Sequence, residues 1–150
     1  MTPREPYDFG TVSEATRHSM QGNKRTNTKP ELLVRRMLRE FGWPGYRLDW
    51  KKATGHPDIA YPGRKIAIFV NGCFWHHHDG CAYATTPKKN VEYWTEKFER
   101  NRARDERTRS ALEQAGWHVV VIWECELKKD TLEATRTRLH DELAYAFVEL

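Results

Sequence analysis

Two short apolar runs place the strongest limit on how this chain can fold. Residues 66–70 read Ile-Ala-Ile-Phe-Val, and residues 117–123 form a second apolar run with tryptophan at each end. A strand with one face in water alternates apolar and polar residues, whereas a continuous apolar run is typical of a strand covered on both faces. We therefore expect both segments to lie inside a layered domain.

Three segments carry apolar residues at helical spacing. The first helix is predicted over 28–41, because Thr28 can cap it, Pro30 suits its first turn, Glu31 completes a capping box and Gly42 ends the run. The second spans 91–114 and ends at Gly116, and Asp130 and Glu133 open the third. The residues expected to face inward are Leu32, Leu33, Met37, Leu38, Phe41, Val91, Trp94, Phe98, Leu112, Ala115, Leu132, Leu139, Leu143 and Phe147.

The remaining elements complete an α/β fold. Strands are predicted at 46–50, 58–61, 65–70 and 117–123, so a mixed central sheet should be flanked by helices. The 150 residues suffice for one domain and one core. We interpret residues 1–12 as a flexible arm and 13–22 as a short helix.

The distribution of charge and the hydropathy of the chain indicate which kinds of partner it could bind. Residues 17–52 hold ten Lys and Arg but three acids, whereas acids outnumber bases in the rest of the chain. A local positive field favours nucleic acid as a partner, with a merely solvated surface as the alternative. The sequence has no membrane-length apolar run and no signal peptide, so we expect a cytoplasmic protein. No heptad or exposed strand pattern requires a second copy, and a monomer is expected.

The cysteines and histidines suggest a metal site. Cys73 and Cys81 bracket three consecutive histidines, and Cys125 follows the apolar run 117–123. Cys73, His78, Cys81 and Cys125 could together hold Zn²⁺ in a closed tetrahedral site that tethers the 71–90 loop to the sheet. His76 or His77 could replace His78 as a ligand. In the alternative interpretation, Cys125 is an ordinary buried residue and the histidines are solvated.

An acid at the start of a strand suggests a second metal. Asp58 follows Pro57 and precedes an apolar strand, which is the outline of many metal-dependent nuclease cores, where such an acid holds Mg²⁺. The usual acid and lysine of the next strand are absent, since Phe69-Val-Asn71 stands there. Asp58 could also be a turn or strand-cap residue. His56 and His76 are candidate proton carriers, and the capping box alone would explain Glu31.

Two large apolar side chains lie where a purely structural role in the core is not expected. Phe74 and Trp75 lie in the polar loop, where they could wedge between bases or stack on one. Trp94 could join them, although core packing explains it equally well. Met20 is a further wedge candidate.

Several motifs together resemble one family. Gly72-Cys-Phe-Trp-His-His-His78, with Gly55-His-Pro-Asp58 upstream and Val121-Ile-Trp-Glu-Cys125 downstream, is similar to the very-short-patch repair (Vsr) endonucleases. The region from Met20 to Glu31 and Glu92-Tyr-Trp94 fit as well, so the resemblance runs from about residue 15 to 128. The family carries a histidine at the position of Asn71, and the interval from His78 to Cys81 is one residue longer here.

The resemblance implies a restriction-endonuclease-like fold of the PD-(D/E)XK type with structural zinc. It implies a Mg²⁺-dependent enzyme that nicks double-stranded DNA 5′ to the thymine of a T:G mismatch and so starts repair at the nucleoid, where other repair proteins are candidate partners. Asp58 and the main-chain carbonyl of Val70 would hold Mg²⁺, with His76 and Glu31 as catalytic residues. The implied zinc ligands are Cys73, His78, Cys81 and Cys125, and the implied DNA contacts are Met20, Asn71, Phe74, Trp75 and Trp94.

Two other functions remain open at this point. The missing acid and lysine would suit a zinc-stabilised DNA-binding module without catalysis. A nickase of the same family could also act on another DNA target, for example in restriction or defence, because loops that the motifs do not encode set the target.

Overall fold

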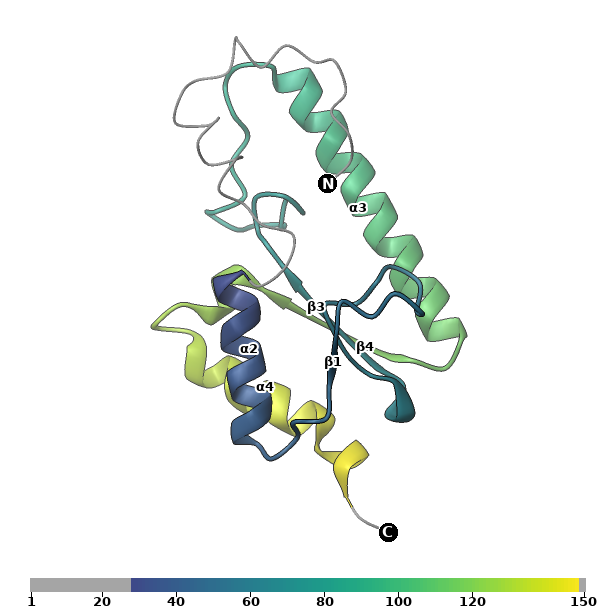
Figure 1. The fold of residues 1–150 in the computed structure, drawn as a ribbon. Coiled ribbons are helices and arrows are strands. Elements are labelled where there is room, and N and C mark those ends of the chain that lie inside the picture. Colours follow the sequence, from purple (N-terminus) through teal and green to yellow (C-terminus); the bar gives the residue numbers. More distant parts are fainter. Residues whose placement is uncertain (1–27, 149–150) are drawn as a thin grey trace.

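The computed structural model describes residues 28–148 and confirms the predicted order of elements (Figure 1). The helices are α2 (Lys29–Glu40), α3 (Val91–Gln114) and α4 (Leu132–Leu143), and the strands are β1 (Arg47–Leu48), β2 (Ile59–Tyr61), β3 (Ile66–Asn71) and β4 (His118–Trp123). Three short 3-10 turns, η2 (Pro62–Arg64), η3 (Glu124–Leu127) and η4 (Ala144–Phe147), follow β2, β4 and α4.

The sheet is mixed, as predicted. Its strand order is β1-β2-β3-β4, with antiparallel pairing of β1 with β2 and of β2 with β3, and parallel pairing of β3 with β4. A parallel pair needs a crossover connection, which α3 provides. The parallel register runs from Ile66 opposite His118 to Asn71 opposite Trp123. The segments that follow β3 and β4 therefore begin side by side.

Helices cover both faces of the sheet, which explains the continuous apolar runs. Helices α2 and α4 lie on one face, where Ile66, Ile68 and Ile122 join Leu38 and Leu139 in the larger core cluster (Figure 1). The other face carries a smaller cluster, in which Ala67 of β3 packs with Leu112 of α3. Alternate residues of β3 thus enter different cores.

Several details differ from the prediction. The first strand is only Arg47–Leu48 instead of 46–50, because Asp49 has a φ of 46° and ends it. Leu32 is 47% exposed, since the inward stripe of α2 is built by Glu31, Val34, Arg35 and Leu38. The sequence pattern could not show that two charged residues would occupy that stripe.

The ends of the two later helices also differ. Val91 is 48% exposed on the first turn of α3, and Ala115 is exposed just beyond its last turn, so neither faces the core as predicted. The last helix begins at Leu132, and Phe147 lies in η4 instead of on the helix. No helix within residues 28–148 is long and apolar enough to cross a membrane. The predicted arm 1–12, the predicted helix 13–22 and Met20 lie outside the described residues.

Candidate active site and metal centre

Asp58 is held at the end of the sheet by the neighbouring strand. It directly precedes β2, and its Oδ2 accepts a hydrogen bond of 2.8 Å from the Val70 main-chain N–H of β3. The Asp49 N–H donates to the Asp58 carbonyl at 3.0 Å, so the β1–β2 ladder fixes the same residue from the other side. The two residues proposed to hold Mg²⁺, Asp58 and Val70, are therefore in direct contact.

The surroundings of Asp58 disfavour its charged form. The pKa of Asp58 is raised to about 7, chiefly by burial and also by the nearby charges of Glu31 and Asp49, although the Val70 N–H and His76 act to lower it. Glu31 of α2 and His76 of the loop after β3 thus act electrostatically on one carboxyl group. A buried carboxylate beside a second acid is a suitable environment for a hard cation with oxygen ligands, so these residues fit Mg²⁺.

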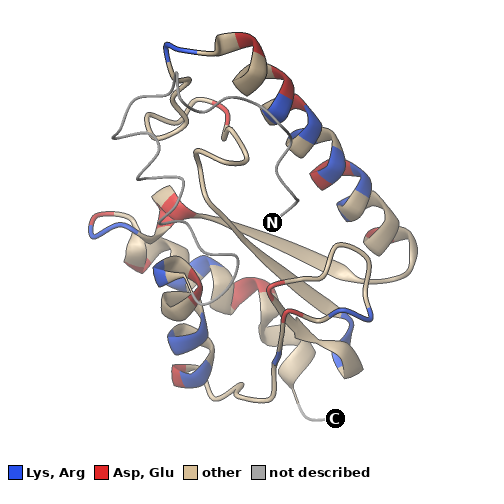
Figure 2. Cartoon of the chain, turned by 45° about the horizontal axis from the view of Figure 1, so that its top comes forward, with Lys and Arg blue, Asp and Glu red and all other residues tan. Residues whose placement is uncertain are grey.

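His76 forms a close pair with an acid that sequence reasoning missed. Its Nδ1 lies 2.5 Å from Oδ2 of Asp105, which projects from the middle of α3. A carboxylate on one ring nitrogen fixes the tautomer and orientation of the imidazole, and leaves the other nitrogen to exchange protons. Charged residues of both signs lie along α3 (Figure 2), and nothing in the sequence spacing distinguishes Asp105 from the others.

A cavity of about 320 Å³ lies beside this pair, between α3 and the sheet. His76, Asp105 and Trp123 line it together with Asn71, whose side chain is only 8% exposed. Asn71 therefore faces the space next to His76, instead of the outer surface. His56, the other candidate proton carrier, is exposed in the turn before β2 and does not line this cavity.

The predicted capping box of α2 forms only in part. Thr28 Oγ1 accepts from the Glu31 main-chain N–H at 3.4 Å, as expected. The Glu31 carboxylate, however, accepts a hydrogen bond of 2.9 Å from Arg35 Nη2 instead of one from the helix start. The capping interpretation of the Glu31 side chain is therefore wrong, and its pairing with Arg35 needs another explanation.

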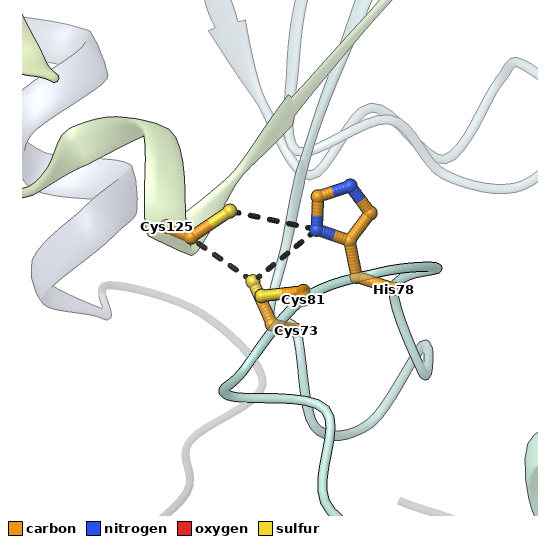
Figure 3. Close-up of side chains that lie close together, drawn as sticks. All are labelled: Cys73, His78, Cys81 and Cys125. Atoms are coloured by element: carbon orange, nitrogen blue, oxygen red, sulfur yellow. Dashed lines mark hydrogen bonds between the residues drawn. The ribbon is translucent and has the colours of Figure 1, made fainter.

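The four predicted zinc ligands come together in space (Figure 3). Their ligand atoms all lie within 4.8 Å of one another, and Nδ1 of His78 is 3.8 Å from Cys73 Sγ and 3.5 Å from Cys125 Sγ. A tetrahedral ion with bonds of about 2.3 Å to sulfur and about 2.1 Å to nitrogen separates such atoms by roughly 3.6 Å. The arrangement fits a closed site for a thiophilic metal.

The structure also indicates which histidine faces the cysteines. His77 Nε2 lies 3.3 Å from Thr86 Oγ1 and His76 pairs with Asp105, so only His78 turns toward the sulfurs. The His78 ring stacks on Trp123 at the end of β4, with centroids 3.9 Å apart. Burial raises the pKa of Cys73 to about 12. A bound metal would oppose this effect, because it displaces the thiol proton.

The aromatic residues form a cluster at the first half of α3. Phe74 packs edge-on against Trp75, Trp94 and Phe98, with ring centroids 5.0–5.5 Å apart. Trp94 is fully buried, whereas Phe74 and Trp75 are half-buried. Asn101 of α3 donates a hydrogen bond of 2.8 Å to the Trp75 carbonyl and ties the loop to the helix. In this structure Trp94 is positioned to support Phe74 and Trp75 rather than to reach a base itself.

The amino-acid sequence of this chain is similar to those of several known proteins. The sequence model of the family described as DNA mismatch endonuclease Vsr matches residues 11–82. The type II nicking enzyme V.XorIIP of Xanthomonas oryzae pv. oryzae is 45% identical over 130 residues, which cover 87% of this chain and 93% of the relative. The chain belongs to the Vsr family.

Other relatives of this Vsr-family chain carry two kinds of name. The type II nicking enzyme V.NmeAIP of Neisseria meningitidis is 42% identical, covering 70% of this chain and 74% of its own. The DNA mismatch endonuclease Vsr of Escherichia coli is 38% identical, covering 64% of this chain and 63% of its own. The chain is thus similar both to a mismatch endonuclease and to nicking enzymes.

Replacement of Asp58 tests whether its buried charge lowers the stability of the folded protein. Because the pKa of Asp58 is raised from 3.8 to about 7, the folded state binds more protons than the unfolded state between those pH values. Wild-type stability should therefore fall as pH rises through this window. Asp58→Asn removes the buried charge and keeps an acceptor for Val70, so we expect it to stabilise the protein by about 1–3 kcal/mol at pH 8 without added Mg²⁺.

Urea unfolding from pH 5 to 8 measures this difference. The stability advantage of Asp58→Asn over the wild type should grow as the pH rises. Added Mg²⁺ should reduce this advantage, because it should stabilise only the wild type. Asp79→Asn, which removes an exposed carboxylate, is the control. A difference that does not depend on pH would show that Asp58 does not carry the buried charge.

The cysteine–histidine group predicts a bound zinc ion. Protein as purified should contain one zinc per chain by mass spectrometry of the metals, and His78→Asn and Cys125→Ser should lose it. Chelation should lower the melting temperature by roughly 10 °C, the shift that about 3–4 kcal/mol produces in a domain of this size. His77→Asn is the matched control and should keep its zinc. Metal-free wild type of unchanged stability would contradict this assignment.

Proposed function

We propose that this Vsr-family chain is a Mg²⁺-dependent DNA endonuclease that nicks double-stranded DNA 5′ to the thymine of a T:G mismatch and so begins mismatch repair. The observation that carries the proposal is the convergence of Asp58, Glu31 and the His76–Asp105 pair at one end of the sheet. Membership of the Vsr family supports DNA as the substrate.

The proposed mechanism gives each side chain one role. Asp58 and the Val70 carbonyl would hold Mg²⁺, and the ion would supply Lewis-acid polarisation of the scissile phosphate and stabilisation of the leaving oxyanion. His76 takes a proton from the attacking water through its free ring nitrogen, and Asp105 keeps the imidazole oriented for that transfer. Glu31 adds negative charge beside Asp58. We assign the fold to the PD-(D/E)XK type because the mixed sheet presents Asp58 at a strand end.

The zinc site serves this mechanism indirectly. The loop after β3 carries both His76 and the Phe74–Trp75 pair but has little apolar content of its own. Zinc held by Cys73, His78, Cys81 and Cys125 would tie that loop to the end of β4. A flexible loop would lose the orientation of His76, so the ion acts on catalysis through rigidity.

Mismatch selectivity would come from the aromatic pair. Phe74 and Trp75, supported by Trp94, would wedge into the base stack, with Met20 at the opposite groove and Asn71 near the backbone. Unstacking costs roughly a few kcal/mol per step and least at a mismatch, so the wedge favours damaged sites. The basic residues between 17 and 52 would add attraction for the phosphates. We expect one domain that acts as a monomer at the nucleoid of the cytoplasm.

The second candidate function is a DNA nickase that uses the same cleavage chemistry on a different DNA target. Two of the relatives described above are named type II nicking enzymes, which favours a nickase associated with restriction. The non-catalytic DNA-binding module is less well supported, because the His76–Asp105 pair has the arrangement of a proton carrier and its orienting acid.

A nicking assay separates these functions. Zinc-loaded protein is incubated with duplexes that carry each mismatch and with a fully paired duplex, with and without Mg²⁺. We expect a nick 5′ to the thymine of T:G only, and Asp58→Ala should lower the rate by at least about a thousandfold. Nicking of paired DNA would support the restriction-type function. Tight binding of T:G duplexes with no cleavage under any metal condition would support the DNA-binding module.

The orienting acid gives a further prediction. Asp105→Asn keeps the size of the side chain but favours the wrong tautomer of His76, so kcat should fall about 10- to 100-fold while KM for the T:G duplex stays within about twofold. Glu113→Gln, an exposed acid at the far end of α3, controls for helix charge. An unchanged kcat in Asp105→Asn would exclude Asp105 from the mechanism.

A further inference from the structure

Helix α2 buries two opposite charges on its inward stripe. Glu31 is 3% exposed and Arg35 is 8% exposed, and they lie one helical turn apart with Nη2 and Oε1 separated by 2.9 Å. Both sit beside Val34 and Leu38, which are fully buried. Charged side chains are rarely buried unless they are paired, and an apolar pair of similar size would often be at least as stable. The ion pair therefore calls for an explanation other than stability.

The pair is also incompletely bonded. Arg35 donates one hydrogen bond, to Oε1 of Glu31, and within residues 28–148 its buried Nε has no acceptor. No hydrogen bond to Oε2 of Glu31 forms among these residues. Pairs of Arg with a carboxylate frequently form two parallel hydrogen bonds. Among the residues that the structure describes, Arg35 anchors one oxygen of Glu31 and no donor bonds the other.

The anchored carboxylate acts on the candidate catalytic acid. The charge of Glu31 opposes ionisation of Asp58, which also has His76 and Asp49 within electrostatic reach. In the usual nuclease core the strand beside this acid brings a second acid and a lysine, but here β3 ends in Phe69, Val70 and Asn71. The first turns of α2 bring the charge of Glu31 within reach of Asp58, and Arg35 holds that acid by a hydrogen bond of 2.9 Å.

We propose that Arg35 is a positioning residue that fixes Glu31 beside Asp58, so that helix α2 supplies the second acid that β3 lacks. The inference rests on the proposed metal-dependent cleavage. Arg35 is buried and acts only through Glu31. Its guanidinium stays charged at any working pH and has a fixed geometry, so its hydrogen bond of 2.9 Å sets the position of the Glu31 carboxylate. Metal affinity at Asp58 then depends on a residue that is not a ligand.

A double-mutant cycle separates positioning from a purely structural role. The variants are Arg35→Met, Arg35→Lys, Glu31→Gln and the double variant Glu31→Gln/Arg35→Met, all in zinc-loaded protein. Arg36→Met removes the same side chain from the neighbouring, exposed position of α2 and is the control for metal binding. The readouts are Mn²⁺ binding without DNA by electron paramagnetic resonance, kcat and KM on a T:G duplex, and the melting temperature.

The expected results follow from action through Glu31. Arg35→Met should weaken Mn²⁺ binding and lower kcat about tenfold or more, with KM for DNA within about twofold. Arg35→Lys should keep most of the Mn²⁺ affinity and most of kcat, because lysine keeps the positive charge. In the Glu31→Gln background the same Arg35→Met change should alter Mn²⁺ binding less than about twofold. Arg36→Met should bind Mn²⁺ like the wild type.

Two results would overturn the proposal. One is a folded Arg35→Met protein that binds Mn²⁺ and cleaves like the wild type, and the other is an Arg35→Met effect that is equally large without Glu31. If Arg35→Met does not fold, Arg35→Gln, which keeps a hydrogen-bond donor, takes its place under the same criteria. A wild type that nicks no duplex refutes the proposed function instead, and the Mn²⁺ data still decide the role of Arg35.

Discussion

The parallel pairing of β3 with β4 determines which residues can meet at the candidate catalytic end of the sheet. Because Asn71 lies opposite Trp123, the loop that follows β3 and the turn that follows β4 start side by side. Cys73 and His78 can therefore approach Cys125, although 47 or more residues separate them in the chain. A one-residue slip would reverse the faces of the strand and separate the two halves of the metal centre. The crossover helix α3 completes the arrangement, since it brings Asp105 to His76.

The candidate catalytic end concentrates groups that a folded protein normally keeps apart. Asp58 and Glu31 are two acids in a partly dehydrated place, and their repulsion is balanced by Arg35, by the Val70 N–H and by the nearby His76. Such an arrangement lowers the stability of the metal-free protein and makes it responsive to a cation. The apolar cores on both faces of the sheet, with residues such as Ile68 and Leu139 fully buried, offset this loss.

Most of the fold could be predicted from the sequence, because the strongest patterns are local ones within single strands and helices. The apolar runs at 66–70 and 117–123 identify strands that are buried on both faces, and the long charged helix was predicted with its observed bounds. The short edge strand β1 was predicted too long, since the positive φ of Asp49 that ends it leaves no pattern in the sequence. The exposure of Leu32 was missed because apolar spacing alone cannot reveal a buried ion pair on the same helix.

Only some residues of the candidate site could be predicted from the sequence. Asp58 and the cysteine–histidine group could be picked out because their spacing is unusual, but Asp105 and Arg35 are ordinary charges on charged helices, and only their contacts distinguish them.

A crystal structure of the zinc-loaded protein with a T:G duplex and Mn²⁺, with the ion located by its anomalous scattering, tests the central claim most directly. Our account predicts a manganese peak on the Asp58 carboxylate, with the scissile phosphate between it and the His76 ring. A complex in which the ion lies away from Asp58, or in which the DNA backbone crosses another part of the protein, would contradict it.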